Sequence, residues 1–95
     1  MRPEMIEGGL FRVYNRFARG EKVFADPKEA IVFVDRLHET KVRDGFSVLA
    51  WALMSDHFHM AVRTSAVPLS RTMQNLQNGF SRSFNRRLSR TGPLW

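Results

Sequence analysis

His57 and His59 are the residues of this sequence whose types and spacing most directly indicate chemistry. Residues two apart in an extended strand point to the same face, with their Cα atoms roughly 6–7 Å apart. Two imidazoles placed in this way can bind one metal ion, while Phe58 and Met60 point to the other face and can pack in a core. From the spacing alone, a structural role for the two histidines is equally open.

A metal site generally needs more than two protein ligands, or water molecules that complete its shell. His38 and the adjacent Glu39 are weak candidates for further ligands, because nothing in the sequence places them beside the histidine pair. Asp56 would point away from His57 in a continuous strand, but in a turn it would fold back toward His57. The only tyrosine is Tyr14.

Positive charge is concentrated in the C-terminal part of the sequence. Residues 1–56 carry equal numbers of acidic and basic side chains, so the net charge of +6 comes entirely from residues 57–95. The charged side chains there are all arginines: Arg63, Arg71, Arg82, Arg86, Arg87 and Arg90. Clustered arginine is typical of phosphate binding. A solvated basic face that keeps the protein soluble is the alternative interpretation.

Length and composition limit the class of protein. Ninety-five residues, 43% of them hydrophobic and eight of them phenylalanine, predict one globular domain spanning residues 1–95, with residues 1–8 as a flexible N-terminus. Because the sequence contains no cysteine, disulfides, zinc knuckles and thiol nucleophiles are excluded. No apolar run reaches the roughly 18 residues of a membrane span, so we expect a cytoplasmic protein without membrane contact.

Three segments are predicted to be strands. Alternation in residues 10–16 divides the side chains between two faces, Phe11 and Val13 on one and Arg12, Tyr14 and Arg16 on the other. Residues 46–54 form a nearly continuous apolar run, which predicts a central strand. A tight turn then leads into residues 57–64, so the two histidines lie at the start of the return strand of a hairpin.

A first helix is predicted to begin at Asp26, which can cap it. Pro27 suits the first helical position, and Glu29 can reach back to form a capping box. The apolar stripe of this helix is Ala30, Ile31, Val34 and Leu37. The helix is expected to end near Gly45, a residue type that commonly terminates helices.

A second helix is predicted from Pro68 to Leu88, and it is amphipathic. Its apolar stripe is Leu69, Met73, Leu76, Phe80 and Phe84. Its polar stripe, on another face, is Arg71, Asn75, Asn78, Arg82 and Arg86. The order strand, helix, strand, strand, helix predicts an α+β fold of the ferredoxin-like type, a split β-α-β sheet with the helices on one face. That fold has a further strand after its second helix, which we expect to come from elsewhere or to be absent.

Five segments, residues 9–16, 23–26, 50–60, 69–87 and 92–95, follow the order seen in single-tyrosine HUH transposases. The chain resembles in particular the REP-associated tyrosine transposase branch, over nearly its whole length from Gly9. A histidine–hydrophobic–histidine element is a weak signal by itself. Preceded by Leu-Met-Ser-Asp and embedded in this series, it is a strong one.

The resemblance implies a metal-dependent DNA transposase. In that family the central strand presents two histidines, matched here by His57 and His59, to Mg²⁺ or Mn²⁺, which polarises a scissile phosphate in single-stranded DNA. A tyrosine attacks to leave a 5′-phosphotyrosine and a free 3′-hydroxyl, without ATP or another nucleotide cofactor. Hairpin DNA is recognised beside the cleavage site, and the proteins commonly act as homodimers. By ligand chemistry alone, imidazole suits zinc better than magnesium.

The same resemblance places the nucleophilic tyrosine, and a polar side chain that completes the metal shell, on a helix beyond the segment at which this sequence ends, Trp95. Tyr14 lies on the first strand, where the family has no nucleophile, so we interpret it as structural. We therefore expect a C-terminally incomplete domain that binds metal loosely, has no catalytic nucleophile within these 95 residues and forms no covalent intermediate.

Hairpin DNA would then be contacted through its phosphates and exposed base edges. The candidate DNA-binding residues are Arg16, Arg71, Asn75, Asn78, Arg82 and Arg86. Two alternatives are a non-catalytic nucleic-acid-binding module that retains the basic helix, and a small basic oligomerisation domain whose histidines are structural.

Overall fold

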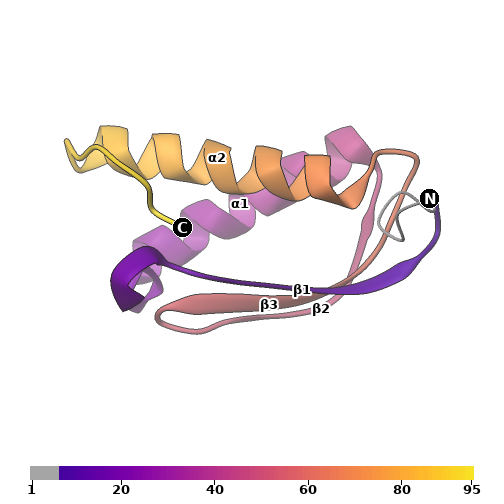
Figure 1. The fold of residues 1–95 in the computed structure, drawn as a ribbon, viewed down its shortest axis with the longest axis horizontal. Helices are drawn as coiled ribbons and strands as arrows, with labels where there is room; N and C mark the ends of the chain where they lie inside the picture. The colour runs from indigo at the N-terminus through magenta and orange to yellow at the C-terminus, as the bar shows by residue number, and fades with distance from the viewer. Residues whose placement is uncertain (1–6) are drawn as a thin grey trace.

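The fold is one antiparallel β-sheet with two α-helices packed on one of its faces (Figure 1). The computed structural model describes residues 7–95, so most of the predicted flexible N-terminus, residues 1–8, lies outside the described residues. The elements in order are β1 (Leu10–Arg16), the 3-10 turns η2 (Ala18–Gly20) and η3 (Val23–Ala25), α1 (Pro27–Asp44), β2 (Ser47–Leu53), β3 (His57–Arg63) and α2 (Leu69–Arg87). This order confirms the α+β succession of strand, helix, strand, strand, helix.

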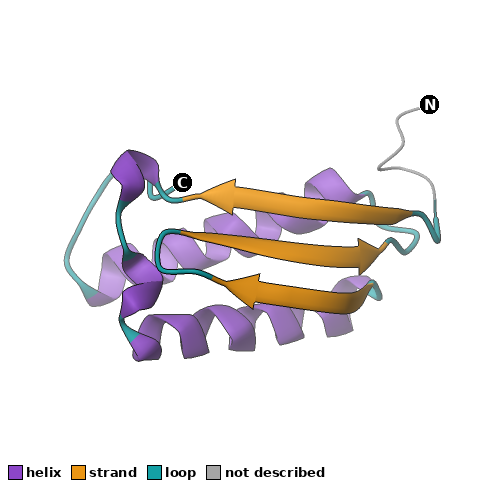
Figure 2. Cartoon of the chain, turned by 90° about the horizontal axis from the view of Figure 1, so that it is seen from below, coloured by secondary structure: helices purple, strands orange, loops and turns teal. Residues whose placement is uncertain are grey.

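The sheet has the order β1-β3-β2, with β3 antiparallel to both neighbours. β1 and β2 are therefore parallel to each other with β3 between them, which is the predicted split β-α-β arrangement. Figure 2 shows the three strands in front of both helices, so the second face of the sheet is uncovered. The prediction that residues 46–54 form the central strand was wrong, because β2 lies at an edge and β3 is central.

β2 is apolar without being buried, which explains the wrong assignment. All seven of its residues are at least partly exposed, including Ala50, Trp51 and Ala52. A continuous apolar run is typical of a strand covered on both faces. In the edge strand β2, the same apolar run arises from Ala50 and Ala52 on the uncovered face and from Trp51, which lies beside α1. The position of a strand depends on its pairing, which such a run does not encode.

The start of α1 follows from local sequence signals. The Asp26 carboxylate accepts a hydrogen bond from the Lys28 N–H at 2.9 Å and so caps the first turn as predicted. The predicted capping box does not form, because the Asp26 N–H donates to the Val23 carbonyl instead. The Glu29 carboxylate is buried and pairs with Arg87 of α2, so it ties the two helices together.

The buried face of α1 is centred on Phe33 and Leu37. Ile31, which the predicted stripe includes, is 61% exposed. Phe33 buries a larger apolar surface than Ile31 would, and its ring centroid lies 5.2 Å from that of Phe58 on β3. α1 is therefore rotated from its predicted orientation. It ends at Gly45 as predicted, where a φ of 81° suits glycine.

The core lies between the helices and the covered face of the sheet. Its members from β3 and α2 are Phe58, Met60, Val62, Met73, Leu76, Phe80 and Phe84. The segment after α2 closes this core, because Leu94 is buried and the Trp95 ring stacks on Phe17 with centroids 4.3 Å apart. No helix in the described part of the chain combines the length and apolar character that a membrane span requires.

Candidate metal and DNA-binding site

β3 presents His57 and His59 on the uncovered face of the sheet. Phe58 and Met60, on the other face, are 0% and 3% exposed, and their burial fixes the alternation of the strand. The two imidazole centroids are 4.9 Å apart, with their planes at 85°. The structure therefore brings the two predicted metal ligands together, on the central strand of the sheet.

Asp56 folds back onto His57, which was one of the two orientations that its place in the turn allowed. Its Oδ1 atom lies 2.6 Å from Nδ1 of His57. The hydrogen bond from His57 lowers the pKa of the Asp56 carboxyl from its usual value. A carboxylate on one ring nitrogen fixes the tautomer and leaves the other nitrogen for a metal ion. Nε2 of His57 is therefore the nitrogen available for coordination.

β1 adds two further side chains to this site. Pairing with β3 sets Tyr14 opposite His59 and Arg16 opposite His57. The Tyr14 ring centroid lies 4.8 Å from that of His59 and 5.4 Å from that of His57. Arg16 donates a hydrogen bond from Nε to the Tyr14 hydroxyl at 3.0 Å. We call Tyr14, Arg16, Asp56, His57 and His59 the histidine cluster.

The sequence alone does not predict the contact of Tyr14 with the two imidazoles. Alternation already placed Tyr14 and Arg16 on one face of the first strand. The register between β1 and β3, which decides their neighbours, has no signal in the sequence. Arg16 is the predicted DNA-binding residue that this register brings to the histidines.

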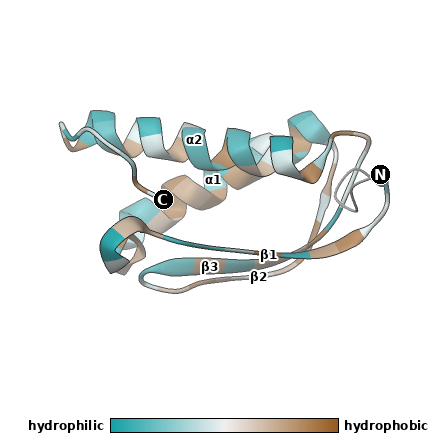
Figure 3. Ribbon diagram, viewed as in Figure 1, coloured by the Kyte–Doolittle hydropathy of each residue, from teal (hydrophilic) through white to brown (hydrophobic). Residues whose placement is uncertain are grey.

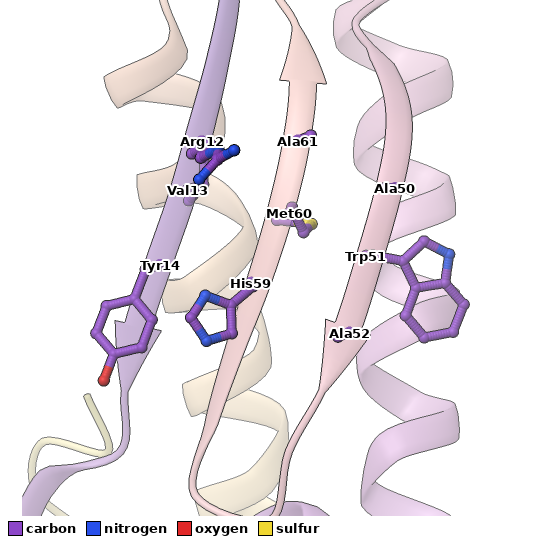
Figure 4. A pocket seen from close by; sticks show the side chains of 9 residues that line it. All are labelled: Arg12, Val13, Tyr14, Ala50, Trp51, Ala52, His59, Met60 and Ala61. Atoms are coloured by element: carbon purple, nitrogen blue, oxygen red, sulfur yellow. The ribbon is translucent and has the colours of Figure 1, made fainter.

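A groove of about 510 Å³ adjoins the cluster on the same face of the sheet (Figure 4). Side chains from all three strands line it, with Tyr14 and His59 beside each other and Arg12 further along β1. Much of the lining is small and apolar: Ala50, Ala52 and Ala61. An apolar groove bordered by the Tyr14 ring and by Arg12 has the chemistry that suits an unpaired base and its phosphate.

The histidine cluster offers two imidazoles as candidate ligands for a metal ion. The described residues contain no group of three or more histidine, cysteine, aspartate or glutamate side chains placed to hold a metal ion. His38 and Glu39 are exposed on α1, which packs against the other face of the sheet, so neither joins His57 and His59. Two imidazoles leave coordination positions for water or phosphate oxygens.

The polar stripe of α2 lies on the other side of the molecule. All its members are exposed: Arg71, Asn75, Asn78, Arg82 and Arg86. They project opposite to the buried stripe of α2, and therefore away from the sheet; Figure 3 shows α2 as largely hydrophilic along its outer side. The structure thus does not bring these five predicted DNA-binding residues to the histidine cluster.

Two C-terminal arginines are neutralised by acidic residues from the first half of the chain. Arg87 pairs with Glu29, and Arg90 pairs with Glu21. The hydrogen bond from Arg90 lowers the pKa of the Glu21 carboxyl. The separation of charge along the sequence is therefore partly cancelled in the fold.

A solved structure of a REP-associated tyrosine transposase bound to a REP hairpin is similar to this chain. The match covers 100% of this chain with a TM-score of 0.79, at 13% sequence identity. The chain spans 55% of the length of that transposase. At this identity the likeness shows the fold, and it agrees with the predicted resemblance.

Sequence comparison identifies the family. No curated protein matches the chain significantly. The family model of IS200-like transposases matches residues 14–95, which include the whole histidine cluster and both helices. The chain therefore belongs to the IS200-like transposase family.

Proposed function

We propose that this domain binds hairpin or single-stranded DNA and, with a divalent metal ion at His57 and His59, prepares a phosphodiester for strand cleavage in DNA transposition. The observation that carries the proposal is the histidine cluster. It gathers two imidazoles, an orienting carboxylate and an arginine on one uncovered sheet face of a transposase-family chain. The similar solved structure is bound to a hairpin, which supports DNA as the partner.

Each member of the cluster has a role in this proposal. When bound by His57 and His59, Mg²⁺ or Mn²⁺ supplies Lewis-acid polarisation of a phosphate oxygen. Asp56 holds the His57 ring through Nδ1. Arg16 donates a hydrogen bond from Nε to the Tyr14 hydroxyl. Its two terminal nitrogens can therefore bind the negatively charged oxygens of a phosphate.

Tyr14 has a structural role in this proposal. Its ring contacts both imidazoles, and its hydroxyl accepts a hydrogen bond from Arg16. It is the only tyrosine of the 95 residues. We therefore propose that the 95-residue polypeptide binds DNA and metal without a nucleotide cofactor and forms no phosphotyrosine intermediate by itself.

Manganese binding tests the metal site. Isothermal titration with Mn²⁺ should detect binding to the wild-type protein and none to the double variant His57→Ala, His59→Ala. Asp56→Asn should weaken binding about tenfold, because it loosens the His57 ring. His38→Ala removes an exposed histidine on α1 and is the matched control, expected to bind like wild type. Equal Mn²⁺ binding by wild type and the double variant would show that these histidines are not the ligands.

A non-catalytic DNA-binding module is the second candidate function, favoured by the exposed polar stripe of α2 on the far side from the histidines. The metal dependence of the DNA complex separates the two. If the histidine cluster binds DNA, EDTA should weaken the complex with a hairpin that carries a single-stranded tail. A module that uses only α2 should bind the same hairpin equally with Mn²⁺ and with EDTA.

We further propose that the domain functions as a homodimer. Apolar side chains are exposed where α1 meets the edge strand β2, with Ile31 at 61% and Trp51 at 54% exposure. Contiguous exposed apolar surface is typical of protein–protein contacts.

A further inference from the structure

A polar groove of about 260 Å³ lies between α1 and α2. Its lining residues are Arg36, Glu39, Thr40 and Arg43 from α1, and Asn75, Leu76, Gly79 and Arg82 from α2. Asn75 and Arg82 belong to the exposed outer stripe of α2. Figure 1 shows both helices on one side of the sheet. The groove between them shares no lining residue with the histidine cluster, which lies on the uncovered face of the sheet.

Gly79 gives Arg36 its place in this groove. Gly79 is buried on α2, and a Cβ atom there would lie 3.1 Å from Nη1 of Arg36. The guanidinium thus occupies the space that a side chain at position 79 would fill. Arg36 is only partly exposed, so its orientation between the helices is restricted.

Arg36 and Arg82 have no acidic ion-pair partner within residues 7–95, a feature that they share with Arg71 and Arg86 of the exposed α2 stripe. Of these four arginines, only Arg36 and Arg82 line the groove. Arg43 pairs with Asp44, and the other partnered arginines belong to α2 and the segment after it. Glu39 lines the groove but bonds to neither Arg36 nor Arg82.

A partly buried guanidinium without a carboxylate is satisfied best by an external anion. The groove is lined by two guanidinium groups without acidic partners, those of Arg36 and Arg82, and by Asn75. Arginine forks match the geometry of phosphate oxygens and can donate two parallel hydrogen bonds. Its volume of about 260 Å³ leaves room for a phosphate group between the helices.

We propose that this groove binds the phosphodiester backbone of DNA, with Arg36 and Arg82 as its principal contacts. The proposal rests on the proposed function, because DNA is taken as the partner. It adds a second site, which includes α1 and lies across the core from the histidine cluster. A DNA molecule that contacts both sites must pass around an edge of the domain, whose short axes measure 22 and 21 Å.

Hairpin binding measured by fluorescence anisotropy at several salt concentrations tests the groove. Arg36→Gln and Arg82→Gln should each weaken binding several-fold and reduce the log–log salt slope by about one. Lys28→Gln removes one exposed positive charge from the first turn of α1, outside the groove, and should change binding little. Gly79→Ala keeps every charge and requires the Arg36 guanidinium to shift by only a few tenths of an ångström, so it should weaken binding less than Arg36→Gln does. Circular dichroism checks that each variant is folded.

Amide chemical shifts show where the DNA binds. Shift changes at Thr40, Asn75 and Gly79 on adding hairpin DNA, reduced in Arg36→Gln, support the groove. If wild type binds DNA and both arginine variants bind it as tightly as wild type, the groove is not a DNA-binding site and the proposed function stands. The same conclusion follows if Lys28→Gln weakens binding as much as the arginine variants do. If the wild-type protein binds no hairpin DNA, both proposals fall.

Discussion

At the scale of single residues, the two candidate metal ligands are not equivalent. His57 has its Nδ1 atom 2.6 Å from the Asp56 carboxylate, so its tautomer and ring orientation are fixed. His59 has no such carboxylate partner among the described residues, and its ring contacts Tyr14 instead. The low pKa of Asp56 keeps the orienting charge present at neutral pH. We therefore expect His57 to be the more strongly oriented ligand.

Tyr14 provides a prediction at this scale. Tyr14→Phe keeps the ring against the imidazoles but removes the acceptor of the Arg16 hydrogen bond. The variant should keep wild-type Mn²⁺ affinity and lose less than about 1 kcal/mol of stability, because the residue is 49% exposed. DNA binding should weaken modestly, because Arg16 is no longer held.

The same variant checks the chemistry assigned to Tyr14. Wild-type polypeptide incubated with Mn²⁺ and single-stranded DNA should give no adduct that survives a denaturing gel. An adduct formed by wild type and absent from Tyr14→Phe would mean that Tyr14 is a nucleophile and that its structural interpretation is wrong.

At the scale of elements, the sequence predicts what local signals control. The bounds of β1 and the caps of α1 at Asp26 and Gly45 depend on residues a few positions apart, and the structure confirms them. Contacts between distant segments follow from packing, so they were missed. Phe33 is buried in the core, where Ile31 was predicted to lie. Glu29 was predicted to complete a capping box, but it pairs with Arg87 of α2 instead.

The site follows the same division. The shared face of the two histidines is a local consequence of strand alternation, and it could be predicted. The register that sets Tyr14 beside His59 joins segments far apart in the chain, so it could not. The contact of the Arg36 guanidinium with Gly79 depends on how α1 and α2 pack against each other. The sequence of either helix alone does not determine that packing.

The end of α2 provides a prediction at the element scale. Arg90 follows the helix and donates two hydrogen bonds to the Glu21 carboxylate, one of them at 2.9 Å, while its guanidinium lies 5.2 Å from the Phe84 ring centroid. Because the pKa of Glu21 is lowered in the folded state, the pair stabilises the fold above the unfolded pKa of about 4.5. That stabilisation is lost as the pH falls through the folded pKa, which lies below this value.

Glu21→Gln should therefore lower the Tm at pH 7 by a few degrees at most, because the pair is partly exposed. The difference from wild type should shrink as the pH is lowered from 4.5 through the lowered folded-state pKa of Glu21, because protonation removes the charge of the pair. Asp35→Asn, which removes an exposed carboxylate without an ion-pair partner in the described chain, is the control. A Tm difference that persists unchanged in acid would contradict the ion-pair explanation.

At the scale of the whole molecule, the two proposed DNA-binding surfaces lie on opposite sides of the domain. The core separates the uncovered sheet face from the outer side of the helices. Charge along the sequence does not predict this arrangement. Arg16, from the balanced first half, lies in the histidine cluster, whereas Arg87 and Arg90 from the basic half are neutralised. DNA that contacts both surfaces must cross an edge, either β1 or β2.

The β2 edge is better suited to a second copy of the chain than to DNA. Leu49 and Trp51 of β2 and Ile31 of the adjacent α1 are each more than half exposed. Ile31 and Trp51 also line a hollow of about 360 Å³ between α1 and β2. An edge strand also offers unpaired backbone groups. Two copies joined through β2 would leave β1, with Tyr14 and Arg16, open as the path for DNA.

Sedimentation velocity over a range of protein concentrations tests this interface. Wild type should dimerise, and the double variant Ile31→Glu, Trp51→Gln should remain monomeric because it places a charge and a polar amide in the apolar contact. Val42→Glu changes an apolar side chain that is 71% exposed on α1 outside the hollow, and it should dimerise like wild type. A double variant that still dimerises would place the interface elsewhere, and then β2 would be as available to DNA as β1.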